Sequence, residues 1–174
     1  EASALIPDFQ QSLNRWCGLL RATGGFIAQK KSKWWLIDFE WNKNKYQYRS
    51  KDEFEHLALN IPQGDSEAVE IEQLDVQEAV ESLGIWITMD GQWDTQKRVL
   101  KEMAATFGAQ IRATKCSKNE AIYTYGYSFL KSLEYCMDVT FLTEKEWKTV
   151  VWPALGPSLQ ASGMSKYFVC KVLY

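Results

Sequence analysis

Two capping boxes in the second half of the sequence constrain the fold more than any other feature. Ser117 is followed three residues later by Glu120, and Thr143 is followed in the same way by Glu146. In this pattern the hydroxyl accepts a hydrogen bond from the backbone N–H of the third helical residue, and the carboxylate accepts one from the backbone N–H of the capping residue. Helices are therefore predicted to begin at both places.

Helical spacing of apolar residues extends these two helices, and a similar pattern from Asp94 to Phe107 predicts a third helix before them. Pro153 lies inside the last segment and is expected to kink or break it, because proline lacks a backbone N–H and its ring collides with the preceding turn. The residues predicted to face the core are Gln96, Leu100, Met103 and Phe107 in the first helix, Ile122, Tyr125, Phe129 and Leu133 in the second, and Trp147, Val150, Val151 and Leu155 in the third.

The first part of the chain predicts one helix and a β-hairpin. Apolar residues recur at helical spacing from Ile6 to Leu20, and Gly24-Gly25 supplies a natural stop. Residues 34–41 and 46–48 are rich in aromatic and β-branched side chains, and the polar residues 42–45 between them are typical of a turn. We expect the two strands to pair across this turn.

The segment from residue 50 to 75 is strongly charged and weakly periodic, which predicts an exposed connection that contributes little to a core. Residues 74–83 predict a short helix after it, and residues 84–89 alternate as a strand.

Together these elements predict an α+β fold. A small antiparallel sheet, built from residues 26–48 and 84–89, is expected beside a flanking helix and is followed by a three-helix bundle. The domain boundary is predicted between the segments 1–83 and 84–174. A chain of 174 residues, 46% of them hydrophobic, is long enough to bury a core in one domain or in two small subdomains.

No complete catalytic or metal-binding constellation is found in the sequence. His56 is the only histidine and lies in the acidic connection, where we expect an exposed side chain without a catalytic partner. The four cysteines are far apart and form no CxxC pair, which argues against a zinc site and against a disulfide framework. A reducing, intracellular location, cytoplasmic or nuclear, is therefore expected. No window approaches the roughly 20 apolar residues of a membrane span, so no membrane partner is predicted.

The basic residues are concentrated between Lys97 and Lys118, a stretch that holds six cations and one acid, Glu102. Such a cluster favours contacts to phosphates, the interaction that dominates nonspecific nucleic-acid affinity. The candidate contact residues are Lys97, Arg98, Lys101, Arg112, Lys115 and Lys118.

Tryptophan side chains are also able to stack on bases, but packing in a core or an interface is their commoner role in periodic apolar segments. That role is predicted for Trp34, Trp35, Trp41, Trp86, Trp147 and Trp152.

The order of several short motifs is similar to one known family. They are, in sequence, a helix with Trp16 and Leu19-Leu20, then Thr23-Gly24-Gly25, Lys31-Ser32-Lys33-Trp34-Trp35, Ser82-Leu83-Gly84-Ile85, Met89-Asp90-Gly91, residues 117–121, Leu133-Glu134-Tyr135 and residues 141–145. This order resembles the C-terminal palm and thumb of non-LTR retrotransposon reverse transcriptases, over nearly the whole chain.

The resemblance implies roles for individual residues. Lys31 matches the lysine of motif D, which is thought to protonate the pyrophosphate leaving group as a general acid. The segment Leu83-Gly84-Ile85 matches the primer-grip strand of motif E. The residues from Asp94 onward match the thumb, which contacts the backbone of the primer-template duplex, so that Lys97, Arg98 and Lys101 are candidate contacts.

The same resemblance identifies what the sequence lacks. Polymerase chemistry requires aspartates that hold two metal ions, from an early strand and from a Tyr-x-Asp-Asp turn, and neither motif is present. Asp8 lies inside a helical segment with no second aspartate beside it and does not match. Magnesium is therefore expected only with the missing palm aspartates, and the chain alone is predicted to be inactive. The missing fingers and first palm strands indicate a fragment, a degraded element or a reused remnant.

Two functions of different classes follow from the sequence. The first is a part of a reverse-transcriptase-like polymerase that binds duplex nucleic acid or an RNA–DNA hybrid, together with the remainder of the polymerase. The alternative is a stand-alone protein-interaction or self-associating module derived from a retroelement. A hydrolase would require a pocket with convergent titratable groups, and the sequence indicates none.

Overall fold

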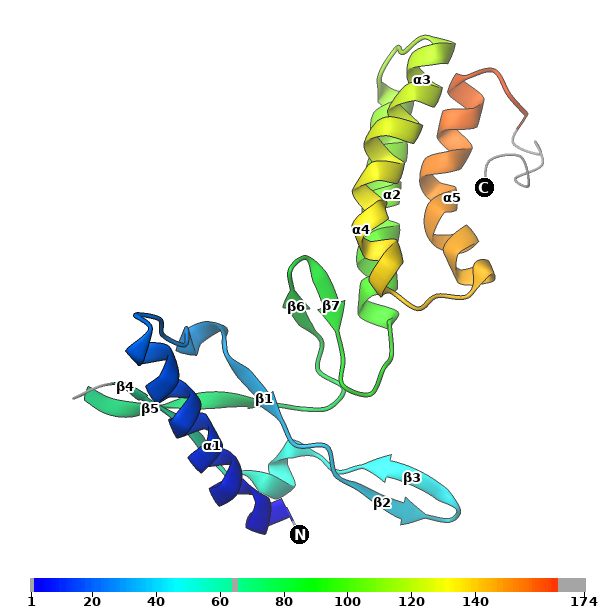
Figure 1. Ribbon diagram of the computed structural model, residues 1–174. Coiled ribbons are helices and arrows are strands. Elements are labelled where there is room, and N and C mark those ends of the chain that lie inside the picture. Colours follow the sequence, from blue (N-terminus) through cyan, green and yellow to red (C-terminus); the bar gives the residue numbers. More distant parts are fainter. Residues whose placement is uncertain (1, 64–65, 166–174) are drawn as a thin grey trace. The chain divides into compact units, whose positions relative to one another are not determined.

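The computed structural model describes residues 2–63 and 66–165, which fold into two compact units (Figure 1). The first unit comprises residues 1–78 and 88–90, and the second comprises residues 79–87 and 91–174. The boundary predicted after residue 83 falls inside the second unit. The mixed α and β content confirms the predicted class, whereas the arrangement of the strands differs from the prediction.

The first unit contains one long helix, three small strand pairings and two 3-10 turns. Its elements are α1 (Ala2–Ala22), η1 (Gln29–Lys31), β1 (Lys33–Trp35), β2 (Phe39–Asn42), β3 (Lys45–Tyr48), η2 (Lys51–Phe54), β4 (Leu59–Gln63) and β5 (Ser66–Leu74). Strands β1, β5 and β4 form one sheet in that order, in which β1 is parallel to β5 and β4 is antiparallel to it. A purely antiparallel sheet was predicted, and this prediction was wrong because β1 pairs with β5 in the parallel direction.

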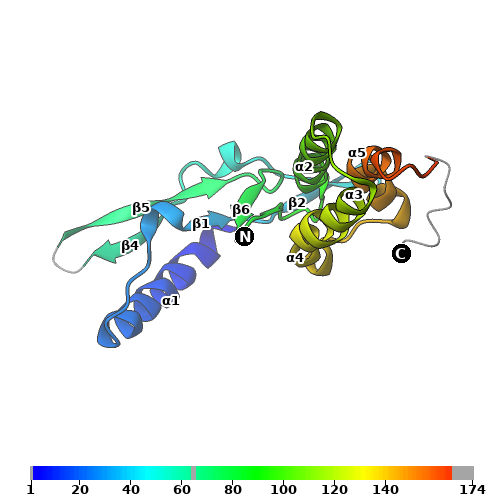
Figure 2. The same ribbon diagram turned by 90° about the horizontal axis from the view of Figure 1, so that it is seen from above.

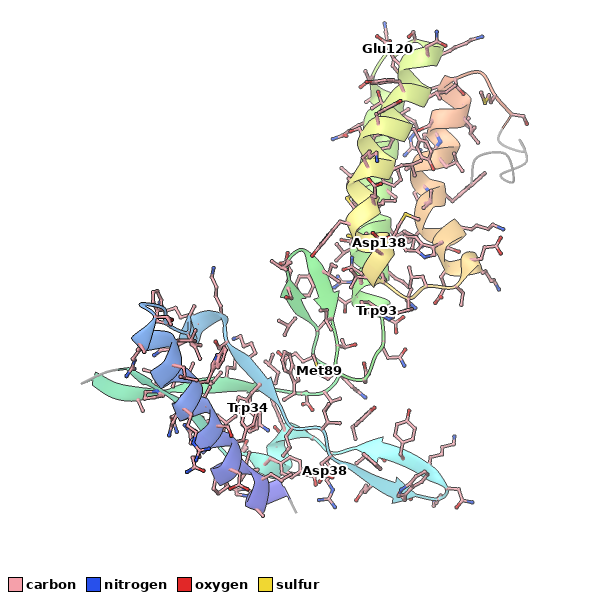
Figure 3. All side chains as sticks on the ribbon, viewed as in Figure 1. Trp34, Asp38, Met89, Trp93, Glu120 and Asp138 are labelled. Carbon is pink, nitrogen blue, oxygen red and sulfur yellow. The ribbon has the colours of Figure 1, made fainter. Side chains whose placement is uncertain are left out.

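The core of the first unit lies between α1 and this sheet. The indole of Trp34 is buried and donates a hydrogen bond to the carbonyl of Ile71 at 3.1 Å, and Figure 3 shows Trp34 next to α1. Leu59 and Ile61 on β4 are buried beside it. The prediction that residues 50–75 contribute little to a core was therefore wrong. Glu70 and Glu72 on β5 are exposed on either side of the buried Ile71, and Leu74 at the end of the strand is also buried.

A side chain of α1 covers the outer edge of β4. The Gln10 amide donates to the carbonyl of Asn60 at 2.7 Å, and its oxygen accepts from the N–H of Asn60 at 2.8 Å. Arg21 donates to the carbonyl of Pro62 on the same strand. These contacts supply partners to backbone groups that an edge strand leaves unpaired.

The predicted hairpin is present, but its first strand is shorter than expected. Strands β2 and β3 pair from Phe39 and Tyr48 to Asn42 and Lys45. The predicted strand 34–41 is divided between β1, which joins the three-stranded sheet, and β2, which joins the hairpin. Asp38 lies where the chain enters the hairpin (Figure 3).

The second unit begins with another hairpin. It consists of β6 (Val80–Ser82) and β7 (Ile85–Ile87), which are antiparallel. The short helix predicted at residues 74–83 is absent from this described stretch because its second half is β6. Strands from residues 26–48 and 84–89 do not share a sheet, which also corrects the prediction, because β7 pairs with β6.

The helices of the second unit are α2 (Asp94–Ala113), α3 (Lys118–Thr124), the π-helical segment η3 (Tyr125–Leu130), α4 (Lys131–Val139) and α5 (Glu144–Ala161). The segments α3, η3 and α4 follow one another without a break. Trp93 at the start of α2 and Asp138 near the end of α4 lie at one end of the bundle, and Glu120 lies at the other (Figure 3). Figure 2 views these helices almost end-on, grouped around a common interior.

Both predicted capping boxes are confirmed. The Ser117 hydroxyl accepts from the N–H of Glu120, whose carboxylate accepts from the N–H of Ser117, and Thr143 and Glu146 form the same pair of bonds. Pro153 does not break α5, which continues through it to Ala161.

One predicted core residue of the second helix was wrong. Ile122 is exposed, whereas Ala121, Tyr125, Phe129 and Leu133 are buried. A π-helical turn holds more residues than an α-helical turn, so η3 shifts the phase of the residues before it. Ala121 is consequently buried at the position in the core that was predicted for Ile122.

Helices α2 and α5 approach closely at a glycine. A Cβ atom placed on Gly108 would lie 2.1 Å from the carbonyl oxygen of Pro153 and 3.1 Å from Cγ of Pro157. Pro157 has no N–H to donate to the Pro153 carbonyl four residues before it, so this carbonyl faces Gly108 without its usual helical partner. The packing of these helices therefore depends on the absence of a side chain at position 108.

Candidate nucleic-acid interface

A basic depression lies between the first halves of α2 and α5. Its two adjoining parts have volumes of about 500 and 600 Å³ and share Lys101, Lys145 and Thr149. We call it the α2–α5 groove, and its lining comprises Asp94, Lys97, Arg98, Lys101, Lys145, Glu146, Lys148, Thr149, Val150, Trp152, Pro153 and Leu155.

Lys97 is held by two carboxylates at the edge of this groove. Its Nζ lies 2.6 Å from Asp94 and 3.0 Å from Glu146, one on its own helix and one on α5. The hydrogen bonds to Asp94 and then Glu146 raise the pKa of the Lys97 ammonium above its usual value. Lys97 therefore joins the two helices, and little of its charge remains for a ligand.

Glu146 is the most perturbed carboxylate of the groove. The backbone N–H of Thr143 is the main cause, the Thr143 hydroxyl and Lys97 add to it, and together they lower the pKa of Glu146 to about 2. This carboxylate therefore stays ionised at neutral pH and keeps both its cap and its ion pair.

The other cations of the groove are less compensated. Among the residues that the structure describes, no carboxylate lies within 4.0 Å of the charged atoms of Arg98, Lys101 or Lys145. Lys148 is paired with Glu144 at 2.5 Å. Three cations from two helices thus face one depression with their charge available.

Two further groups add hydrogen-bonding and stacking capacity to this site. Thr149 lines the groove, and its carbonyl lacks the usual helical donor because Pro153, four residues later, has no N–H. Trp152 lines the groove and is partly exposed, so of the two predicted places, a core or an interface, the core is excluded. The depression is suited to a polyanion with a flat or hydroxyl-bearing component.

The structure separates the six predicted cations into two groups. Lys97, Arg98 and Lys101 line the groove. Arg112 follows Lys101 by about 16 Å along the axis of α2, from the usual rise per residue. Lys118 lies beside Gly163, which follows the end of α5, so the predicted cations beyond Lys101 lie toward the opposite end of the bundle.

Lys145 was missed by sequence reasoning although it shares the groove with Lys101. The available signal was the spacing of Lys145, Thr149 and Trp152, which places these three residues on one side of α5. The sequence alone did not indicate that this side faces the cations of α2.

The residues matched to polymerase motifs D and E are not among those that line the α2–α5 groove. Lys31 is exposed at the end of η1 in the first unit. Leu83 and Gly84, with φ of 51° and 82°, form the turn between β6 and β7, and only Ile85 belongs to a strand. The expectation of a strand at Leu83-Gly84-Ile85 is corrected in this respect, because positive φ at two successive residues produces a tight hairpin turn.

The remaining candidates show no site chemistry. His56 is exposed, as predicted. Cys17 and Cys136 are buried and Cys116 is half-buried, and Cys170 lies outside the described residues. Within residues 2–63 and 66–165, no group of three or more His, Cys, Asp or Glu side chains is placed to hold a metal ion.

None of the helices in the described part of the chain has an apolar stretch long enough to cross a membrane. Comparison with known proteins identified no relative: no family model, no curated protein and no solved structure matches this chain.

Proposed function

We propose that this protein binds double-stranded nucleic acid, such as an RNA–DNA hybrid, through the α2–α5 groove, as a thumb-like part of a reverse-transcriptase-like polymerase. The observation that carries the proposal is the convergence of Arg98, Lys101 and Lys145 on one depression. The two carboxylates in its lining, Asp94 and Glu146, are paired with Lys97. Lysine and arginine contacts to phosphates position a protein on a duplex without reading its sequence.

The proposal assigns no catalytic step to this chain. Polymerase chemistry depends on aspartates that hold two metal ions, and the described residues contain no such cluster. Lys31 remains a candidate general acid only in an assembly that supplies those aspartates, and Leu83-Gly84-Ile85 remains a candidate primer contact there. Binding by this chain is expected to be weak, with dissociation constants of about 10⁻⁴ to 10⁻⁶ M at physiological salt.

The test compares two triple variants that remove the same charge at different places. Fluorescence anisotropy of a labelled RNA–DNA hybrid is measured across a salt series for the wild type, for Arg98→Gln/Lys101→Gln/Lys145→Gln, and for Arg112→Gln/Lys115→Gln/Lys118→Gln. The groove variant should flatten the plot of log affinity against log salt by up to roughly 0.9 per lost phosphate contact. The second variant should retain most of the wild-type slope.

The outcome distinguishes a groove from a general charge effect. Equal loss of slope in both variants would show that net charge and not the groove determines binding. No binding at low salt would remove the nucleic-acid function altogether.

A second candidate function is supported by α1. Leu5, Phe9, Trp16 and Leu19 are exposed, and their spacing places them on one side of this helix, next to the side that packs on the sheet. Phe9 and Trp16 are 56% and 57% exposed. An apolar stripe of this length fits a protein-interaction or self-associating module, or contact with the remainder of a polymerase.

The dependence of binding on salt concentration distinguishes the second function from the first. Association through the α1 stripe should persist at high ionic strength, whereas phosphate contacts weaken. Sedimentation velocity at low and high salt, with Phe9→Gln/Trp16→Gln as the test variant, measures self-association. Assembly that the variant does not reduce would refute a role for the stripe in self-association.

A further inference from the structure

The β2–β3 hairpin carries an exposed face made only of aromatic side chains. Phe39 is paired with Tyr48 and Trp41 with Tyr46, so these four side chains lie on one face of the hairpin. Phe39, Trp41 and Tyr46 are exposed, and Trp41 is 72% exposed. Trp41 was predicted to pack in a core or an interface, and its exposure excludes the core. An exposed aromatic face of this kind indicates a binding role.

The geometry of the rings leaves space for flat ligands. Tyr46 meets Phe39, Trp41 and Tyr48 edge to face, with centroid separations of 6.4, 6.5 and 5.6 Å. Edge-to-face contacts leave ring faces uncovered. Phe39, Trp41 and Tyr46 stay exposed despite these contacts, so a base can stack on the outer side of a ring.

The tip of the hairpin adds positive charge. Lys43 and Asn44 have φ of 48° and 65°, so both central residues of the turn are left-handed. Asn, Asp and Gly are favoured at the central positions of such turns, so a lysine at position 43 is uncommon. Lys43 and Lys45 have no carboxylate within 4.0 Å in the part of the chain that the structure describes, whereas Arg49 at the base pairs with Asp38 at 3.5 Å. Lys45 pairs with Asn42 on the opposite face of the hairpin, which also carries Glu40, so Lys43 in the turn is the cation next to the aromatic face. Exposed rings beside a cation are suited to single-stranded nucleic acid, which presents unpaired bases and phosphates.

We propose that the β2–β3 hairpin binds single-stranded RNA or DNA by stacking unpaired bases on Phe39, Trp41 and Tyr46, with Lys43 on a phosphate. Stacking is tolerant of sequence because every base has a π-face, so no sequence preference is expected. This site is independent of the α2–α5 groove. It uses base faces, which a duplex hides, whereas the duplex contacts proposed for the groove are made by cations to phosphates.

The test uses a labelled 12-nucleotide oligouridine and an abasic oligomer of the same length, with anisotropy as the readout. All proteins carry Arg98→Gln/Lys101→Gln/Lys145→Gln, so that failure of the groove proposal does not affect the result. The variant Trp41→Leu/Tyr46→Leu keeps apolar side chains but removes the π-faces. It should weaken oligouridine binding by about 5- to 100-fold, from the usual contribution of base–aromatic stacking.

Matched variants separate stacking from loss of folding. Trp41→Phe/Tyr46→Phe retains the rings and should bind oligouridine within about threefold of its parent. Lys43→Gln should lower the salt slope by up to roughly 0.7, the value for one lost contact with a single strand. Circular dichroism establishes that each variant is folded, which is expected because Trp41 and Tyr46 are exposed.

Three results would overturn the proposal. The first is unchanged oligouridine binding by the leucine variant, and the second is equal affinity of the parent for the abasic oligomer and oligouridine. The third is a parent that binds no oligouridine but self-associates in sedimentation, with the leucine variant monomeric, which would assign the aromatic face to a second copy of the chain.

Discussion

Substitution of Gly108 by alanine tests the packing of α2 against α5. The added Cβ would lie 2.1 Å from the carbonyl oxygen of Pro153, far inside the roughly 3.5 Å at which nonbonded atoms make favourable contact. The obstacle is backbone, so no side-chain rotation relieves it. The two helices must move apart or bend.

The expected magnitude is a balance of two opposing effects. Alanine is favoured over glycine inside a helix by about 1 kcal/mol. Overpacking of a close contact typically costs 1–3 kcal/mol, and occasionally more. Because the overlap here exceeds 1 Å and involves the backbone, the upper part of this range applies. We expect a net loss of about 1–2 kcal/mol in the free energy of unfolding.

Urea unfolding followed by circular dichroism at 222 nm measures this change. Gly126→Ala in η3 is the matched control, because an added Cβ there meets nothing within 4 Å. The control should be neutral or more stable by up to about 1 kcal/mol. If Gly108→Ala is as stable as Gly126→Ala, the close approach of the two helices is wrong and so is the groove built on it.

The remaining predictions concern single contacts. Gln10→Ala removes both bonds to Asn60, so the backbone N–H and C=O of this residue must then be hydrated by water. It should destabilise the first unit by about 1–3 kcal/mol, and an unchanged midpoint of urea unfolding would contradict this. Glu146 has a pKa of about 2 against an ordinary value of 4.5, so its stabilisation is complete above about pH 4.5 and is lost as the pH falls toward 2. Glu146→Gln should flatten the pH dependence of the melting temperature in that window, and an unaltered acid limb would refute the assignment. Leu133→Ala should lower the free energy of unfolding by about 2–5 kcal/mol, whereas Ile122→Ala should change it by less than about 1 kcal/mol. Similar losses for the two variants would show that η3 does not shift the buried positions of this helix.

The helical unit was the more predictable half of the fold. A capping box is a local signal, so Ser117 and Thr143 identified helix starts without reference to any other element. Ile122 was misplaced because a regular helical period was assumed, and the phase change in η3 has no local sequence signature that we recognise.

The sheet of the first unit was missed for a physical reason. Residues such as Glu70 and Glu72 gave the segment the composition of an exposed loop, although they alternate with the buried Ile71. Pairing of β1 with β5 joins Lys33 to Glu72, which are far apart in the sequence, and such nonlocal pairing cannot be inferred from composition.

The candidate site was predicted only in part for the same reason. A run of cations along the sequence identified Lys97, Arg98 and Lys101, whereas Lys145 is added by the register in which α5 packs on α2. The sequence also indicated aromatic residues around Trp41, but not that they stay exposed. The sequence therefore identified the types of residue in the candidate site, but only the tertiary structure shows which residues lie together and which are exposed.

The bonds between Gln10 and Asn60 determine how the first unit resists aggregation. They occupy the N–H and C=O that an incoming strand from another molecule would use at this position of β4. Recruitment of a further strand at Asn60 therefore requires α1 to detach first. Conditions that loosen α1, such as mild heating or proteolytic removal of its first turns, should convert β4 into a template for intermolecular sheet growth while the second unit stays folded.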